Sequence, residues 1–166
     1  MGSAMICHTE TDSPYGLLTL VAADGALCGL YMTAQRHRPP EEDFGPRDDS
    51  LACFDAAREQ LEAYYAGELR EFSLELNLRG TPFQRTVWDQ LVRIPYGETR
   101  TYGQLADALG KPGASRAVGL ANGRNPIGII VPCHRVVGSD GSLTGYGGGL
   151  DRKRRLLDFE RGTALF

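Results

Sequence analysis

The first half of the chain carries apolar residues in short runs that are typical of a small β-sheet. Residues 16–21 and 26–32 are two such runs, and Ala23-Asp24-Gly25 lies between them. Apolar runs on either side of an Asp-Gly turn predict a β-hairpin. Apolar and polar side chains then alternate over residues 72–78, which predicts a further half-buried strand.

A helix is predicted between the hairpin and this strand. Apolar residues recur every three or four positions from Leu51 to Tyr65, which is the spacing of one helix face. Ser50 is the expected N-cap of this helix, and Gly67 is expected to end it. Residues 34–49 are rich in proline, arginine and acidic residues, so we expect them to form an exposed connection.

Helix signals dominate the second half of the chain. Thr81-Pro82-Phe83-Gln84 combines an N-cap threonine, a proline at the first helical position and a glutamine three residues after the cap. This combination predicts a helix that continues to about Ile94. Thr101-Tyr102-Gly103-Gln104 repeats the capping signature and predicts a second helix, which stops at Gly110. A third short helix is expected from Ser115 to Asn122.

The second and third of these helices are joined by Lys111-Pro112-Gly113, which is the pattern of a helix-turn-helix. The third helix is built largely from alanine and glycine, so its backbone could approach a nucleic-acid groove, and Arg116 lies near its start. Ordinary helix packing explains the small residues equally well. The pattern alone therefore leaves contact with DNA open.

The last third of the chain contains an apolar run, a glycine-rich segment and a basic helix. Residues 127–131 are rich in β-branched side chains and predict a buried strand, and Pro132 would leave Cys133 at its end. The glycines from 138 to 149 predict a loop whose backbone can reach a ligand. A final helix is expected over 151–160, with its basic run at 152–155 either solvated or close to phosphate.

These elements together predict an α/β chain, of the α+β kind, with two domains. Residues 1–80 would form a small antiparallel sheet with one helix, and residues 81–166 a mostly helical domain that contains the helix-turn-helix. Residues 1–4 resemble a cloning remnant. The chain has no run of about 18 apolar residues and no signal-peptide pattern, so we expect no membrane span and a cytoplasmic protein.

Charge and cysteine content narrow the possible functions. Residues 1–80 hold 6 Lys/Arg and 14 Asp/Glu, while residues 81–166 hold 12 and 7, so only the second part has a basic surface for phosphates. The four cysteines are irregularly spaced, without a Cys-x-x-Cys pair, which argues against disulfides and zinc fingers and suits a reducing compartment. Cys7 and Cys28 with His8 and His37 are the only metal ligands worth considering, and we predict no metal site.

Cys133 and His134 are the candidate catalytic pair. A cysteine becomes a strong nucleophile when a neighbouring base or cation holds it as the thiolate. His134 is that base by position, and Glu160 is an acid that could orient the imidazole. A buried cysteine beside a hydrogen-bonded surface histidine is the simpler alternative, and the spacing alone leaves the electrophile undetermined.

The sequence around this pair, Pro132-Cys133-His134-Arg135-Val136 within IVPCHRVV, resembles the signature of one protein family. The similarity extends from Thr81 to Glu160 through FQRTVWDQL, IPYGETRTYGQLA, SRAVGLANGRNP and LTGYGGGL, and DSPYGLLTL and YYAGEL extend it toward the amino terminus. The family is that of the O6-alkylguanine-DNA alkyltransferases, of bacterial type. The resemblance implies direct repair, in which one displacement moves an alkyl group from guanine O6, and from thymine O4, to a cysteine of the protein.

The resemblance implies a role for each site residue. Cys133 would be the alkyl acceptor, His134 its base through a water, and Glu160 the carboxylate that orients His134. Asn125 would hydrogen-bond near the thiol and support the turn, and Tyr102 would donate to guanine N3 and crowd the rotating phosphate. The base pocket would be formed by the following residues: Val136, Tyr146, Gly147, Gly148 and Gly149.

The same resemblance implies how DNA is bound. The third helix would enter the minor groove, and Arg116 would fill the gap that the extruded nucleotide leaves. The full set of implied DNA contacts is Tyr102, Ser115, Arg116, Ala117, Ala121, Asn122 and Arg135. The partner would be duplex DNA with O6-alkylguanine, bound by a monomer, with cooperative binding left open. No cofactor is required, because the lesion itself supplies the alkyl group.

The product would be a thioether without a good leaving group, so each protein molecule would act once. Three other classes fit this sequence less well. Alkyltransferase-like proteins bind lesions without repair but lack the acceptor cysteine, and a fused methyl-sensing regulator would require a further cysteine-rich domain. A cysteine hydrolase fits poorly with an adjacent Cys-His pair that follows a helix-turn-helix.

Overall fold

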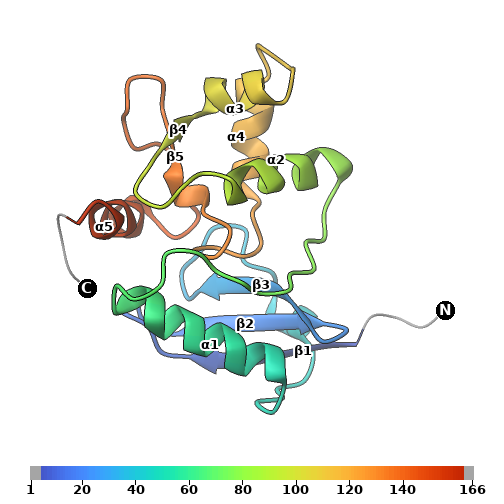
Figure 1. The fold of residues 1–166 in the computed structure, drawn as a ribbon. Coiled ribbons are helices and arrows are strands. Elements are labelled where there is room, and N and C mark those ends of the chain that lie inside the picture. The colour runs from blue at the N-terminus through green and yellow to red at the C-terminus, as the bar shows by residue number, and fades with distance from the viewer. Residues whose placement is uncertain (1–4, 163–166) are drawn as a thin grey trace. The chain divides into compact units, whose positions relative to one another are not determined.

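The computed structural model describes residues 5–162 and divides into two compact units, with the boundary between Arg79 and Gly80 (Figure 1). The architecture is mixed α/β, with a three-stranded antiparallel sheet in the first unit, which confirms the predicted fold class. The proposed cloning remnant at residues 1–4 lies outside the described residues. Between residues 5 and 162, no helix is long and apolar enough to cross a bilayer.

The sheet of the amino-terminal unit consists of β1 (Ile6–Thr11), β2 (Leu18–Ala23) and β3 (Ala26–Met32), in that order. The hairpin of β2 and β3 confirms its prediction. Asp24 and Gly25 both have positive φ, 53° and 82°, as the tight turns of β-hairpins require. Strand β1 was not predicted, because its sequence ICHTET has too few apolar residues for a clear alternating pattern.

Helix α1 (Ala52–Tyr65) confirms the predicted helix, but the predicted cap is wrong. Leu51 is the N-cap residue and makes no side-chain capping bond. Ser50 instead directs both its amide and its hydroxyl to the Asp48 carboxylate, so it belongs to the preceding turn. Gly67 follows the helix with a φ of 77°, the left-handed conformation that ends many helices.

The strand predicted over residues 72–78 is wrong. Only Leu76 pairs with the sheet, through an isolated bridge to Leu27, and the Asn77 amide donates to the Leu27 carbonyl at 2.8 Å. The reason is that α1 competes for this backbone. The Gln60 side chain accepts from the Ser73 amide at 2.8 Å and donates to the Ser73 carbonyl at 3.2 Å. These bonds attach the segment to α1, so its alternating sequence does not form a strand.

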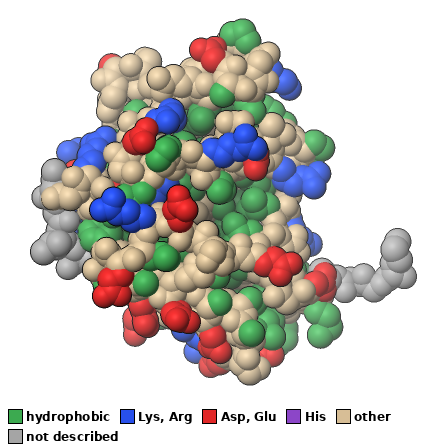
Figure 2. Space-filling view, in the orientation of Figure 1, with side chains coloured by type: hydrophobic (Ala, Val, Ile, Leu, Met, Phe, Trp, Pro, Cys, Tyr) green, Lys and Arg blue, Asp and Glu red, His purple; other side chains and the backbone are tan. Residues whose placement is uncertain are grey.

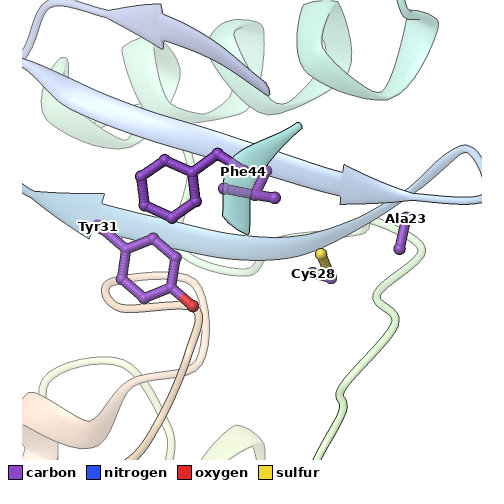
Figure 3. Close-up of a cluster of buried hydrophobic side chains, with 5 residues drawn as sticks. Ala23, Cys28, Tyr31 and Phe44 are labelled. Atoms are coloured by element: carbon purple, nitrogen blue, oxygen red, sulfur yellow. The ribbon is translucent and has the colours of Figure 1, made fainter. Parts of the chain in front are cut away.

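The connection over residues 34–49 is also more structured than its composition indicates. It contains the 3-10 helix η1 (Glu41–Phe44), and Phe44 is buried. The Phe44 and Tyr31 rings are stacked with centroids 5.6 Å apart, in a cluster with Cys28 and Ala23 (Figure 3). The prediction that this connection is exposed is therefore wrong at Phe44, because this one aromatic side chain attaches a mainly polar segment to the core.

The carboxy-terminal unit is mostly helical. Its helices are α2 (Pro82–Val92), α3 (Tyr102–Ala108), α4 (Ser115–Gly123) and α5 (Leu150–Glu160). Both predicted capping boxes are present: the Thr81 and Thr101 side chains accept from the Gln84 and Gln104 amides, and each glutamine bonds back to the backbone of its threonine. α4 packs against both α2 and α3, and the Trp88 indole nitrogen donates to the Ala121 carbonyl at 2.8 Å.

The strand predicted over residues 127–131 is absent, and a buried turn takes its place. Up to residue 162, this unit contains two short strands that were not predicted, β4 (Arg100–Thr101) and β5 (Val136–Val137), which pair in parallel. Ile129 has a φ of 69°, which an extended strand cannot contain. Cys133 consequently lies at the start of the 3-10 helix η2 (Cys133–Arg135), and not at the end of a strand.

The two units differ in surface charge. In Figure 2, acidic side chains gather over the amino-terminal unit and basic side chains over the carboxy-terminal unit, as their residue counts predict.

Candidate active site

The backbone turn before Cys133 is built around the side chain of Asn125. Its Nδ2 donates to the Val131 carbonyl at 2.7 Å, and its Oδ1 accepts from the Ile127 amide at 3.0 Å. Both backbone groups are buried, so these bonds satisfy groups that a strand would otherwise pair. Pro132 has φ and ψ of −82° and 64°, and the Cys133 amide donates to the Val131 carbonyl at 2.8 Å. This is an inverse γ-turn, and it places Cys133 at the start of η2.

The Cys133 thiol is buried, with 7% of the residue exposed. Burial raises the pKa of the thiol, while a hydrogen bond from the Asn125 side chain and the positive charge of Lys153 act in the opposite direction. The net effect is an elevated pKa, so the resting side chain is the neutral thiol at neutral pH. A base must therefore remove its proton before the sulfur can act as a strong nucleophile.

His134 has the properties of such a base. Its ring is fully buried, and its Nε2 lies 2.8 Å from Oε2 of Glu160. Burial lowers the pKa of the imidazole, although the Glu160 carboxylate acts to raise it, so the ring is neutral near pH 7. Nδ1 is buried and has no hydrogen-bond partner among the described residues.

Glu160 determines which ring nitrogen carries the hydrogen. Burial alone would raise the pKa of this carboxyl, but His134 and Arg135 together hold it well below its usual range, so the group is ionised. An ionised carboxylate only accepts hydrogen bonds. His134 must then donate from Nε2, which leaves the lone pair on Nδ1.

Arg135 is the second partner of this carboxylate. Its Nε donates to Oε1 of Glu160 at 2.8 Å and its second guanidinium nitrogen to Oε2 at 3.0 Å, while the third donates to the Ile94 carbonyl at 2.7 Å. The side chain is 7% exposed. The predicted DNA contact of Arg135 stays a prediction, and these three hydrogen bonds are all directed into the interior of this unit.

Lys153 is a buried cation that the sequence analysis overlooked. Its Nζ donates to the carbonyls of Thr144 at 2.8 Å and Gly145 at 3.3 Å. Burial lowers its pKa to about 8, against the opposing influence of Cys133. The basic run 152–155 is thus not uniformly a solvated face. The side chain of its second member turns inward and ties the glycine-rich loop to α5.

The glycine-rich loop is also connected to α3. The Tyr102 hydroxyl donates to the Thr144 carbonyl at 3.1 Å. Val136 is buried in β5, and residues 146–148 are half-buried, while Gly149 is exposed and begins α5 with a φ of 95°. Tyr102 and the predicted base-pocket loop are therefore brought together, although they are more than 40 positions apart in the sequence.

The residues predicted to contact DNA on α4 divide into two groups. Arg116 and Ala117 are exposed and Ser115 is half-buried, so these three can reach a ligand outside the protein. Ala121 and Asn122 are 4% exposed, and they lie on the side of α4 that packs inside the unit. Helical periodicity places them on the buried face, so their assignment as DNA contacts stays a prediction that this placement does not favour.

Within residues 5–162, no group of three or more His, Cys, Asp or Glu side chains is arranged to hold a metal ion. The Nδ1 atom of His8, one of the possible ligands, is instead 2.9 Å from the Gly45 carbonyl.

Comparisons with known proteins cover both units. Residues 82–162 match the model of the 6-O-methylguanine DNA methyltransferase DNA-binding domain, and residues 6–78 match that of the ribonuclease-like domain of the same family. The methylated-DNA–protein-cysteine methyltransferase of Mycobacterium tuberculosis strain H37Rv is 55% identical over 160 residues, 96% of this chain and 95% of the relative. That of Methanosarcina acetivorans is 63% identical over 149 residues, 90% and 94% of the two chains. The structure of Mycobacterium tuberculosis OGT in complex with DNA matches with a TM-score of 0.86, covering 95% of this chain and 94% of that one.

Proposed function

This chain belongs to the 6-O-methylguanine DNA methyltransferase family, and from that membership we propose that it repairs O6-alkylguanine in duplex DNA by moving the alkyl group to Cys133. The observation that carries the proposal is the buried series of Cys133, His134 and Glu160, with a neutral imidazole held by an ionised carboxylate. A thiol that is protonated at rest and lies beside a neutral base is suited to one activated displacement.

The reaction begins with loss of the thiol proton. His134 Nδ1 takes it through a bridging water, which converts the imidazole to imidazolium next to the Glu160 carboxylate. Lys153 and the Asn125 side chain both favour the thiolate, since each lowers the pKa of Cys133. The negative charge thus forms in a buried site that already contains a cation and a hydrogen-bond donor.

The thiolate sulfur then attacks the alkyl carbon, a carbon–sulfur bond forms, and the carbon–O6 bond breaks with its electron pair on the purine. Donation from the Tyr102 hydroxyl to guanine N3 stabilises the departing base. This role is supported by the hydroxyl's place beside the glycine-rich loop, where it donates to Thr144. Thymine alkylated at O4 presents the same kind of carbon–oxygen bond and is an expected second substrate.

A stacked base cannot reach a buried thiol, so the nucleotide must leave the duplex at a cost of a few kcal/mol. We assign Arg116 to the gap that remains, with α4 in the minor groove. Arg116 and Ala117 are exposed on that helix and Ser115 is half-buried there. The base pocket is assigned to Val136 and to residues 146–149, and the protein is taken to act as a monomer.

The thioether product has no good leaving group, so each molecule is consumed. Intact mass after incubation with an O6-methylguanine duplex or with free O6-benzylguanine tests the proposal. We expect one alkyl group per molecule, a yield that saturates at one equivalent, and no shift in Cys133→Ser. No mass shift in folded protein would refute alkyl transfer and leave a lesion-binding protein, while repair of several equivalents would refute the single turnover alone.

A further inference from the structure

Arg135 is a buried arginine with no assigned part in the chemistry. Its guanidinium makes two hydrogen bonds to the Glu160 carboxylate, and one to the Ile94 carbonyl. Its guanidinium carbon also lies 5.7 Å from the centre of the Tyr96 ring. A two-pronged contact between a guanidinium and a carboxylate is geometrically demanding, and lysine cannot reproduce it.

The carboxylate that Arg135 holds is the one that His134 uses. Oε2 of Glu160 lies 2.8 Å from His134 Nε2 and 3.0 Å from the Arg135 guanidinium, so one oxygen serves both partners. Bonds from Arg135 to both oxygens prevent rotation of the carboxylate. They also leave Glu160 with a positive neighbour even when the imidazole is neutral.

We propose that Arg135 is a positioning residue that keeps Glu160 anionic and His134 neutral in the resting protein, so that Nδ1 is free to accept the thiol proton. This inference rests on the proposed function, because it gives the imidazole the part of a base. Without Arg135, the Glu160 carboxylate would lose two guanidinium hydrogen bonds and a positive neighbour, while its contact with His134 would remain. A buried carboxylate in that situation favours protonation of the imidazole, and a protonated imidazole cannot accept another proton.

The charges around the imidazole give the expected sign. Glu160 raises the pKa of His134, whereas Arg135 and Lys153 lower it. Cys133 from the same 3-10 helix is neutral at rest, and the uncharged Tyr96 ring lies near the Arg135 guanidinium. Removing the Arg135 charge should thus raise the pKa of His134, and removing the Glu160 charge should lower it. A purely structural role would not produce opposite shifts.

The experiment measures the pH dependence of alkylation by free O6-benzylguanine in Arg135→Met, Arg135→Lys and Glu160→Gln. In Arg135→Met, the acidic limb of the rate profile should move to higher pH by about one unit, the usual effect of a close charge. In Arg135→Lys the limb should stay near its wild-type position while the maximal rate falls. In Glu160→Gln the limb should move to lower pH. Arg85→Met is the matched control, because it removes an exposed arginine from α2.

Histidine ring NMR measures the same quantity without any reaction. The chain has only three histidines, so His134 can be identified from the signal missing in His134→Gln. Its titration should move upward in Arg135→Met and downward in Glu160→Gln. Equal rate losses at every pH in Arg135→Met, with an unmoved His134 titration in that variant, would overturn the inference and reduce Arg135 to a structural ion pair. Absence of wild-type alkylation would instead refute the proposed function. If Arg135→Met does not fold, Arg135→Gln takes its place with the same expected upward shift, because it removes the charge but keeps hydrogen-bond donors.

Discussion

The two units bury polar groups in different ways. Among residues 5–162, the buried polar residues of the amino-terminal unit are two threonines, Thr9 and Thr19. The carboxy-terminal unit buries two asparagines and four charged or titratable side chains: His134, Arg135, Lys153 and Glu160. Buried charges are expensive and are retained only where they are paired. The buried charged groups are therefore concentrated in the unit that contains the candidate active site, where they lower stability unless they are paired.

Each unit also contains a buried cysteine, and their surroundings differ. Cys28 belongs to an apolar cluster with Tyr31 and Phe44 (Figure 3). Burial raises its pKa, as it does for Cys133, and Arg79 opposes the shift as Lys153 does for Cys133. Burial and a nearby cation are therefore common to both thiols. The difference is that Cys133 is followed by a buried imidazole that contacts a carboxylate, so a candidate base distinguishes the proposed nucleophile from the packing residue.

The most direct test of the difference between the two buried cysteines is to replace cysteines in each unit by serine. Cys133→Ser should lose alkyl uptake completely, because a hydroxyl is far less acidic than a thiol. A variant with Cys7, Cys28 and Cys53 all replaced by Ser should keep the wild-type stoichiometry. Peptide mapping after reaction with O6-benzylguanine gives the answer, and alkyl groups on any amino-terminal cysteine would contradict the distinction.

Glu160→Gln should produce the next largest effect. It removes the charge that orients His134, so reaction rates with duplex and free base should both fall about 100-fold, the scale of general-base catalysis. It also leaves Arg135 buried without its carboxylate, which should lower the free energy of unfolding by about 3 kcal/mol. A normal rate with free O6-benzylguanine would show that another group orients the imidazole.

The stability effect of Glu160 should depend on pH. Its folded-state pKa lies below the ordinary carboxyl value of 4.5, so its contribution is complete above that value and is lost as the pH falls toward the folded pKa. Urea unfolding of the wild type and Glu160→Gln should differ most at pH 7 and least at pH 3. A constant difference across this range would argue against the lowered pKa.

Lys153→Met tests whether the buried cation assists the thiolate. Loss of its charge should raise the pKa of Cys133 and slow alkylation at pH 7 by about tenfold, with partial recovery at higher pH. Exchange of the Gly149 amide, which donates to the Tyr146 carbonyl in the same loop, should become faster, because the loop loses its hydrogen bonds to the ammonium. The exposed neighbour Arg154, changed to Met, is the control. An unchanged rate with a loosened loop would limit Lys153 to holding the loop.

Arg116→Ala separates DNA handling from chemistry within the second unit. Repair of O6-methylguanine in duplex DNA should slow roughly tenfold, equivalent to about 1.4 kcal/mol, while reaction with free O6-benzylguanine should be unaffected. Arg85→Ala removes another exposed arginine from the same unit and should change neither rate. Equal losses on both substrates would count against a gap-filling role for Arg116.

Phe44→Ala should have the smallest effect on the rate. It tests whether a packing defect in the amino-terminal unit changes the reaction in the carboxy-terminal unit. It removes a buried ring from the amino-terminal cluster, which should lower the free energy of unfolding by about 3 kcal/mol. The alkylation rate of the folded protein should remain at the wild-type value. Thermal unfolding measures the loss of stability, and alkylation rates measured well below the unfolding midpoint test the second expectation. A slower reaction in fully folded protein would show that the first unit influences the chemistry.

The sequence by itself was sufficient to predict the elements that depend on residues close together in the chain. Both capping boxes lie within four residues, the β2–β3 hairpin depends on its two-residue turn, and the helices follow from local periodicity. The proposed nucleophile and its proposed base are adjacent in the sequence, and a family signature surrounds them. All these signals act over short separations, so local physical chemistry determines them.

Only the tertiary structure decided the partners of buried polar groups. The Asn125 side chain turns an apolar run that resembled a strand into a tight turn, and Gln60 draws an alternating segment to a helix. Arg135 and Lys153 resemble surface or DNA-contacting residues in the sequence, yet the fold buries them against Glu160 and the Thr144–Gly145 carbonyls. A charged side chain is buried only where distant segments supply its hydrogen bonds, and no local pattern reports which segments those are.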